Sequence, residues 1–121
     1  MPIWGPLREL RIVKGDPAVV ILRLEGALNG SAECFAFLDR IHDDTQRSGV
    51  RLVINLTEVG YLGSSGVGIL VSIYRSVTGN GGRICLTGVE GRNRAILREV
   101  HLLEVIPNAA SEDEAVSFVS E

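Results

Sequence analysis

The chain has 121 residues, of which 45% are hydrophobic and 22% are charged, which is the balance of a folded globular protein rather than a disordered one. Its net charge of −3 does not supply the basic face that direct nucleic-acid binding requires. The length suits one domain and is too short for two, so we expect residues 1–121 to form a single domain.

The first third of the chain predicts a hairpin followed by a helix. Residues 10–13 and 18–24 are short β-rich runs, and the turn residues of 15–17 separate them. Residues 26–30 are predicted to be a loop, and a helix is predicted over 32–46. Its N-cap is expected at Ser31, and its inward side is expected to hold Phe35, Leu38, Ile41 and His42.

The middle of the chain predicts a buried strand and a buried helix. Residues 51–56 are a nearly continuous apolar run, which is typical of a strand covered on both faces. Residues 57–63 are predicted to be a loop. The helix predicted over 65–78 is apolar around most of its circumference and should therefore be largely buried, and the glycines of 79–82 end it.

The last third predicts two strands that alternate with two helices. An inner strand is expected at 83–87 and a helix at 91–100, with Ile96, Leu97 and Val100 facing inward. Residues 103–106 are predicted to be the last strand, stopped by Pro107. Ser111 and Glu114 then form a capping box that opens a final amphipathic helix.

The element order β-β-α-β-α-β-α-β-α predicts an α/β fold. We expect a mixed, mostly parallel sheet of about five strands with an antiparallel N-terminal edge hairpin, and about four helices. Cys34 and Cys85 lie in apolar runs without a CxxC spacing, which predicts buried, reduced thiols and a reducing cytoplasm. Polar residues interrupt the longest apolar run, so no membrane insertion is expected.

The loop at residues 63–68, Gly-Ser-Ser-Gly-Val-Gly, is the most informative segment. It follows a strand and starts a buried helix, whose N-terminus has free N–H groups and a positive dipole end. A serine here is either an N-cap in a tight turn or an exposed hydroxyl at a place where an added phosphate is tolerated. Gly66 is expected to allow close approach of another surface, and Gly68 close packing of the first helical turn.

Enzymatic readings find little support in the sequence. The loop does not have the form G-x-S-x-G, because position 67 is Val, and no Lys follows the glycines as in a Walker A loop. His42 and His101 have no paired nucleophile motif, and no cluster has metal-ligand spacing. We therefore expect no catalytic residue, metal or cofactor.

The segment LVINLTEVGYLGSSGVGILVSIYRS resembles the signature of STAS domains, above all of the anti-sigma factor antagonists. The similarity continues through GGRICLTGVEGRNRAILREVHLLEVIPNAASEDEAV and gives a domain core over about 10–119. In that family the first serine of the loop is phosphorylated by a kinase of the histidine-kinase-like ATPase fold that is also the anti-sigma factor. The unphosphorylated antagonist captures this kinase and so frees a sigma factor.

By motif position the resemblance assigns the phosphorylation site to Ser64. It also assigns a partner-binding surface, formed by Asn29, Gly63, Ser64, Ser65, Gly66 and Gly68. Gly63 and Asn29 each stand where the family commonly has Asp, so this surface lacks two carboxylates. The alternative function is that of an accessory STAS subunit that docks on the cytoplasmic ATPase of a lipid-type ABC transporter. A weak homodimer also remains open.

Overall fold

The computed structural model describes residues 5–121. Its five strands and four α-helices follow the predicted order, with one added 3-10 helix, η1. The elements are β1 (Arg8–Lys14), β2 (Val19–Leu28), α1 (Ala32–Asp44), β3 (Arg51–Leu62), α2 (Ser64–Gly79), β4 (Arg83–Thr87), α3 (Gly91–Glu99), η1 (Leu102–Glu104), β5 (Asn108–Ala109) and α4 (Glu112–Ser120).

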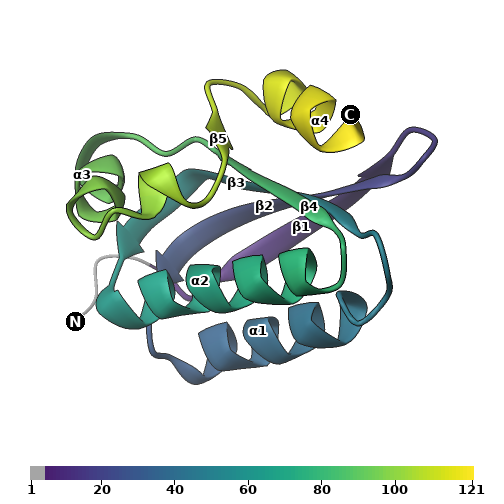
Figure 1. Cartoon of the computed structure of the whole chain (residues 1–121). Coiled ribbons are helices and arrows are strands. Elements are labelled where there is room, and N and C mark those ends of the chain that lie inside the picture. Colours follow the sequence, from purple (N-terminus) through teal and green to yellow (C-terminus); the bar gives the residue numbers. More distant parts are fainter. Residues whose placement is uncertain (1–4) are drawn as a thin grey trace.

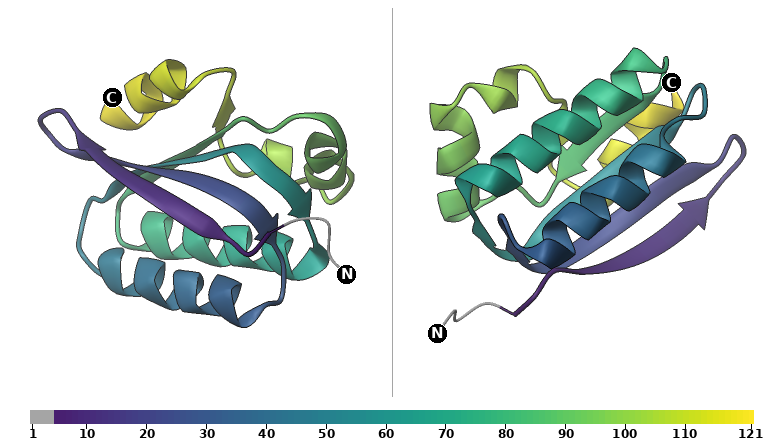
Figure 2. Two further views of the ribbon diagram at one scale, coloured as in Figure 1. Left: turned by 180° about the vertical axis from the view of Figure 1, so that it is seen from behind. Right: turned by 90° about the horizontal axis from the view of Figure 1, so that it is seen from below.

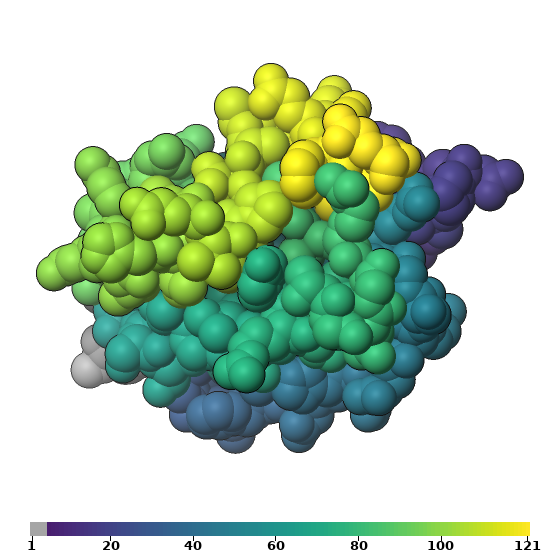
Figure 3. All heavy atoms as spheres, viewed as in Figure 1, coloured from purple at the N-terminus to yellow at the C-terminus, as the bar shows by residue number. Residues whose placement is uncertain are grey.

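The five strands form one mixed sheet in the order β1-β2-β3-β4-β5. β1 runs antiparallel to β2, and the other three pairings are parallel. The predicted α/β fold with an antiparallel edge hairpin is therefore confirmed. The tip of this hairpin projects beyond the rest of the molecule (Figure 1, Figure 3).

Helices cover the two faces of the sheet unequally. Helices α1 and α2 lie side by side on one face, and α4 lies on the other face (Figure 2). The larger core fills the space under α1 and α2, where Phe37, Leu22, Ile54 and Ile73 are fully buried. A second cluster under α4 contains Val19, Ile21, Val53, Cys85, Ala115 and Val119. Cys34 and Cys85 are both buried and free, as the sequence predicted.

Strands β2 and β3 extend further than the sequence indicated. The loops predicted at 26–30 and 57–63 are wrong over most of their length, because β2 continues to Leu28 and β3 to Leu62. Both end residues are buried. The two strands stay paired through register shifts, one of which follows Gly26, and such irregularities weaken the alternation of apolar and polar residues that identifies a strand.

Two residues expected to face inward are exposed. The side chain of Phe35 is 49% exposed and that of Val100 is 48% exposed. The buried side of α1 instead passes through Cys34, Phe37 and Ile41, and successive helical residues are turned by about 100° from one another. Phe35 follows Cys34 directly, so it points away from the core.

The strand predicted at 103–106 is also wrong. Leu102 and Leu103 belong to η1, and the strand that completes the sheet is Asn108–Ala109, which pairs with the end of β4. Leu102, Leu103 and Ile106 reach the core at a spacing that suits a helical turn as well as a strand. Pro107 joins the sheet through its carbonyl, which accepts a hydrogen bond from the Leu86 N–H.

Both predicted serine caps are present. The hydroxyl of Ser31 accepts a hydrogen bond from the Cys34 N–H, and that of Ser111 accepts one from the Glu114 N–H. The Glu114 carboxylate reaches back by one residue more than a capping box requires, because it accepts from the Ala110 N–H. Within residues 5–121, no helix is both long and apolar enough to cross a membrane.

Candidate functional site

The candidate site lies where β2 and β3 end side by side. Leu28 and Leu62 are register partners, and the Gly63 N–H donates a 3.0 Å hydrogen bond to the Leu28 carbonyl. A Cβ atom on Gly30 would lie only 3.1 Å from the Ser65 hydroxyl oxygen. The fold therefore brings the loop that holds Asn29, 34 residues earlier in the chain than Gly63, against the loop that precedes α2.

Ser64 is the first residue of α2 and not its cap. The N-cap is Gly63, which has extended backbone geometry, and no side chain caps this helix end. Ser64 and the following Ser65 are both exposed. Of the two interpretations left open by the sequence, an N-cap in a tight turn does not describe Ser64, whose hydroxyl stands at the surface.

The close approach expected at Gly66 is made by the end of β2, whereas the close packing expected at Gly68 is absent. Gly66 is buried, and a Cβ atom there would overlap the Leu28 carbonyl oxygen and lie 3.0 Å from the Leu62 side chain. Gly68 is exposed, and a Cβ atom there would have no atom within 4 Å. Gly66 thus permits α2 to pack on the end of β2, whereas Gly68 leaves the helix surface flat beside Ser64 and Ser65.

Asn29 organises its own loop. Its side-chain oxygen accepts a 2.9 Å hydrogen bond from the Ser31 N–H, and its backbone N–H donates to the Cys34 sulfur at 3.3 Å. An oxygen that accepts from the N–H two residues later forms an Asx turn. The uncharged amide of Asn29 therefore fixes the start of α1 next to Ser65. An aspartate at this position could accept the same hydrogen bond through one carboxylate oxygen.

An aromatic–cation pair borders the site, and the sequence analysis missed it. A Cβ atom on Gly63 would lie 3.0 Å from the edge of the Tyr61 ring. The Arg92 guanidinium is stacked over the same ring, 5.1 Å from its centroid. The ring thus takes the space that a side chain at position 63 would need, and Arg92 adds a positive charge near the start of α2.

Helix α3 holds Arg92 in this place. The buried amide of Asn93 donates a 2.8 Å hydrogen bond to the Val59 carbonyl and so ties α3 to β3. The motif of residues 63–68 gave no sign of this contact, because α3 begins 23 residues after Gly68. Only the position of Tyr61, two residues before Gly63, connects this pair with the motif in the sequence.

The exposed Phe35 is a second feature that sequence reasoning missed. It lies in the first turn of α1, where its N–H donates to the Ser31 carbonyl. It therefore follows the Asn29 loop directly. Aromatic side chains, Phe included, are enriched in protein–protein interfaces, and Phe35 is half exposed.

The start of α2 has no acidic side chain in its first turn, and both histidines lie outside the loop at residues 63–68. The N-terminal dipole of α2 therefore has no carboxylate in that turn to compensate it. His42 bonds the Ser72 hydroxyl between α1 and α2, and His101 lies beside Glu104. Across residues 5–121, no three His, Cys, Asp or Glu side chains are grouped as metal ligands.

Comparison with known proteins places this geometry in a family. The model of the STAS domain matches residues 11–115, and a search of curated proteins found no match. An anti-sigma factor antagonist from Mycobacterium paratuberculosis is 22% identical with a TM-score of 0.71, over 94% of this chain and 96% of that one.

Two further structures have the same fold. The anti-sigma factor antagonist SpoIIAA in its unphosphorylated form is 19% identical, with a TM-score of 0.69 over 93% of this chain and 98% of its own. A sulfate transporter family protein from Wolinella succinogenes is 17% identical, with a TM-score of 0.65 over 83% of each chain. At these identities the likeness shows the shared fold.

Proposed function

Because this chain belongs to the STAS domain family, we propose that it is an anti-sigma factor antagonist whose binding is switched by phosphorylation of Ser64. In its unphosphorylated form it captures an anti-sigma factor that is also a serine kinase of the histidine-kinase-like ATPase fold. Capture releases a sigma factor for transcription. Since such a kinase uses ATP, we place both proteins in the cytoplasm.

The observation that supports this proposal most is the free position of Ser64. Its hydroxyl is exposed at the first residue of α2, while Gly63 takes the cap position. A kinase can therefore reach the hydroxyl without unfolding the helix end. The added phosphate, of about −1.5 to −2 charges, would lie at a helix N-terminus that stabilises an exposed anion by about 0.3–1 kcal/mol.

The proposed docking surface consists of Asn29, Gly63, Ser64, Ser65, Gly68 and Phe35. All but Asn29 and Gly63 are exposed, and those two are partly so. Gly66 lies beneath this surface and supports it. The surface is small and almost uncharged, so a partner fitted to it would meet a neutral hydroxyl at Ser64.

Phosphorylation would disrupt such a contact for a simple reason. The partner would have to remove water from a doubly charged group and accommodate its volume, which costs several kcal/mol if the charge is left unpaired. The helix dipole favours the phosphate in the free protein and gives the partner no help. The switch would thus change affinity while leaving the fold intact.

We also propose that the protein acts by binding and not by catalysis. Neither histidine lies in the loop that holds Ser64: His42 contacts Ser72 from the last turn of α1, and His101 is exposed beside Glu104. A serine nucleophile needs a base within hydrogen-bond reach. Purified protein should therefore show no hydrolysis of nucleotides, esters or phosphoesters. A robust rate that Ser64→Ala abolishes would contradict this.

Phosphate mapping tests the proposal. Serine-kinase anti-sigma factors from the same genome would be incubated one at a time with ATP and wild type, Ser64→Ala or Ser65→Ala. We expect one kinase to phosphorylate wild type and Ser65→Ala but not Ser64→Ala, with mass spectrometry placing the phosphate on Ser64. Phosphate found only at Ser65 would contradict the assignment.

An accessory subunit of a transporter would present the same loop to an ATPase. That function requires a docking surface but no phosphorylation of Ser64. Binding to a transporter ATPase with equal affinity by wild type and Ser64→Asp, and no phosphate transfer from any kinase, would favour it.

A further inference from the structure

Strand β1 leaves one edge of the sheet open. It pairs with β2 on one side, and no strand among residues 5–121 pairs with its other side. Of the five large hydrophobic residues that are exposed within residues 5–121, β1 carries two, Leu10 at 55% and Val13 at 63%. Open, partly apolar edges tend to pair with another strand unless something protects them.

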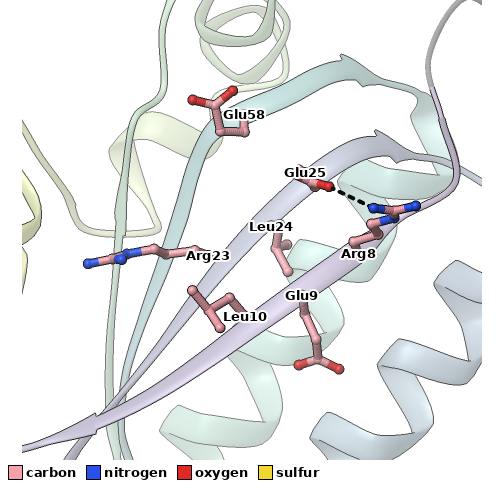
Figure 4. A pocket seen from close by; sticks show the side chains of 7 residues that line it. All are labelled: Arg8, Glu9, Leu10, Arg23, Leu24, Glu25 and Glu58. Atoms are coloured by element: carbon pink, nitrogen blue, oxygen red, sulfur yellow. Dashed lines mark ion pairs between the residues drawn. The ribbon is translucent and has the colours of Figure 1, made fainter.

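The side chains of β1 alternate between the two faces of the sheet. Leu10 lies opposite Arg23 and Ile12 opposite Ile21, on the face that α4 covers further along. Glu9 and Arg11 lie on the opposite face, toward α1, where Arg40 and Asp44 contact them. Figure 4 shows Glu9 pointing to the helix side of β1, away from Arg8 and Glu25.

We propose that two copies of this chain associate through their β1 strands, antiparallel and with Leu10 at the two-fold axis. In this register Leu10 of each copy lies against Leu10 of the other. Glu9 of each copy faces Arg11 of the other, and Leu7 faces Val13. The pairing would cover both exposed apolar side chains of β1 and form two intermolecular ion pairs.

Charge selects this register over its neighbours. A two-fold axis normal to a continuous sheet passes between two copies of the same residue, so the alternatives are centred on other single residues. Centring on Arg11 would oppose two arginines and also place Arg8 against Lys14. Centring on Glu9 would oppose two carboxylates, and centring on Ile12 would form no opposite-charge pair. Directly opposed like charges destabilise a strand pair.

Arg11 is the better placed of the two charged residues for the additional contact, because its side chain is 40% exposed and that of Glu9 is 18% exposed. One Glu9 oxygen accepts from Arg40 at 2.7 Å. The other, Oε2, is buried without a hydrogen-bond partner within the described part of the chain and lies 3.9 Å from Arg11 of the same copy, so the ion pair between copies requires Glu9 to turn toward the open edge. Arg11 contacts Asp44 at 2.7 Å through one nitrogen, and its side chain remains 40% exposed. A guanidinium has five N–H donors, so Arg11 can keep Asp44 and also reach Glu9 of a second copy.

The association should be weak, because one seven-residue strand buries less surface than the roughly 1,200–2,000 Å² of a stable interface. None of the residues of the proposed docking surface belongs to β1, the strand that makes the proposed contact. The proposal therefore does not rest on the proposed function, and its failure would leave that function untouched.

Disulfide trapping tests the register. The variants Leu10→Cys and Arg8→Cys would be oxidised under the same mild conditions, and both native cysteines are buried. Opposed residues of an antiparallel pair have Cβ atoms about 4.5–5.5 Å apart, whereas two copies of residue 8 would be offset by about 13 Å. We expect covalent dimers of Leu10→Cys to form at least tenfold faster than those of Arg8→Cys.

Charge reversal provides a second, independent test. In a dimer of Glu9→Arg, arginine at position 9 would face Arg11 of the other copy, and in a dimer of Arg11→Glu two glutamates would face each other. Sedimentation should therefore find each variant monomeric at concentrations where wild type associates. An equimolar mixture of the two restores both ion pairs and should associate again. Equal trapping rates for the two cysteine variants, or a mixture that sediments no faster than its components, would overturn the proposal.

Discussion

Gly66 and Gly68 are two residues apart near the start of α2 and therefore lie on opposite sides of the helix, one buried and one exposed. We predict that Gly66→Ala lowers the free energy of unfolding by about 2 kcal/mol or more, because its Cβ would overlap the Leu28 carbonyl oxygen. Gly68→Ala should raise it by about 0.5–1 kcal/mol, because the new methyl meets no atom and alanine favours the helix. Urea titrations of both variants would measure this. Equal effects would mean that α2 does not pack on β2 as described.

Phe35 provides the second prediction at the residue scale. We expect Phe35→Ala to weaken binding of the partner by about 1–2 kcal/mol, as loss of an aromatic anchor does, with little change in stability because the side chain is half exposed. The matched change Phe37→Ala removes a fully buried ring and should cost about 3–5 kcal/mol of stability. Calorimetric titration and thermal melts separate the two effects. Normal binding by Phe35→Ala would remove α1 from the docking surface.

Single residues also mark where the sequence was informative. The motif predicted that Ser64 and Ser65 lie at the start of a buried helix, and both serines are exposed at the start of α2. It could not tell which glycine packs inward, because that depends on the end of β2, whose Leu28 lies 38 residues before Gly66 in the chain. Arg92 was missed for the same reason, since its contact with Tyr61 is made only by the tertiary fold.

At the scale of elements, α4 is fastened to the sheet by Glu112. The Glu112 carboxylate accepts hydrogen bonds from the Arg23 guanidinium at 2.7 and 3.0 Å and from the Asn55 amide at 2.9 Å. The hydrogen bond from Arg23 lowers the pKa of Glu112 from about 4.5 to about 2. Burial opposes this shift, and the hydrogen bond from Asn55 and the charges of Arg23 and Lys14 support it. The first residue of α4 thus anchors it to β2 and β3.

This depressed pKa predicts how stability depends on pH. A carboxylate with a lower pKa in the folded state stabilises the fold above its unfolded pKa, and the contribution is lost as pH falls from about 4.5 to about 2. Since Arg23 is half exposed, solvent screening reduces the contribution to about 1–2 kcal/mol. At pH 7 the free energy of unfolding of wild type should exceed that of Glu112→Gln by this amount. Near pH 2 the two values should be equal.

Urea titrations across this range check the prediction, with Asp113→Asn as the control. Asp113 lies in the same turn of α4 and is exposed, so its loss removes a charge without removing the Arg23 contact. It should not reproduce the loss of stability at pH 7. A constant difference between wild type and Glu112→Gln from pH 7 to pH 2 would contradict the role given to Glu112.

Elements with strong periodicity or clear end signals were predictable, and irregular ones were not. The sequence predicted α1, α2 and β4 within about two residues, because cap residues and glycines mark their ends. The extension of β3 to Leu62 was not predictable, since polar residues interrupt its apolar run. Likewise β5 has only two residues and exists because it pairs with the end of β4.

At the scale of the whole molecule, element order was enough to predict the fold. A hairpin followed by alternating helices and strands gives one mixed sheet, and the strand order β1-β2-β3-β4-β5 agrees with this. The site then follows from the fold, because the carboxyl ends of β2 and β3 bring Asn29 beside Gly63. The side-chain packing at the ends of β2 and β3 decides which loop residues belong to the proposed docking surface and which, like Gly66, are buried beneath it.

Binding of a serine-kinase anti-sigma factor to the unmodified protein and to the protein phosphorylated at Ser64 tests the central claim most directly. Calorimetric titration should give an affinity for the phosphorylated form about a hundredfold lower, which corresponds to roughly 2.7 kcal/mol. Thermal melts should show that both forms remain folded, and Ser64→Ala should bind as wild type does. Equal affinities for the phosphorylated and unmodified forms would contradict the assignment of Ser64 as the switch.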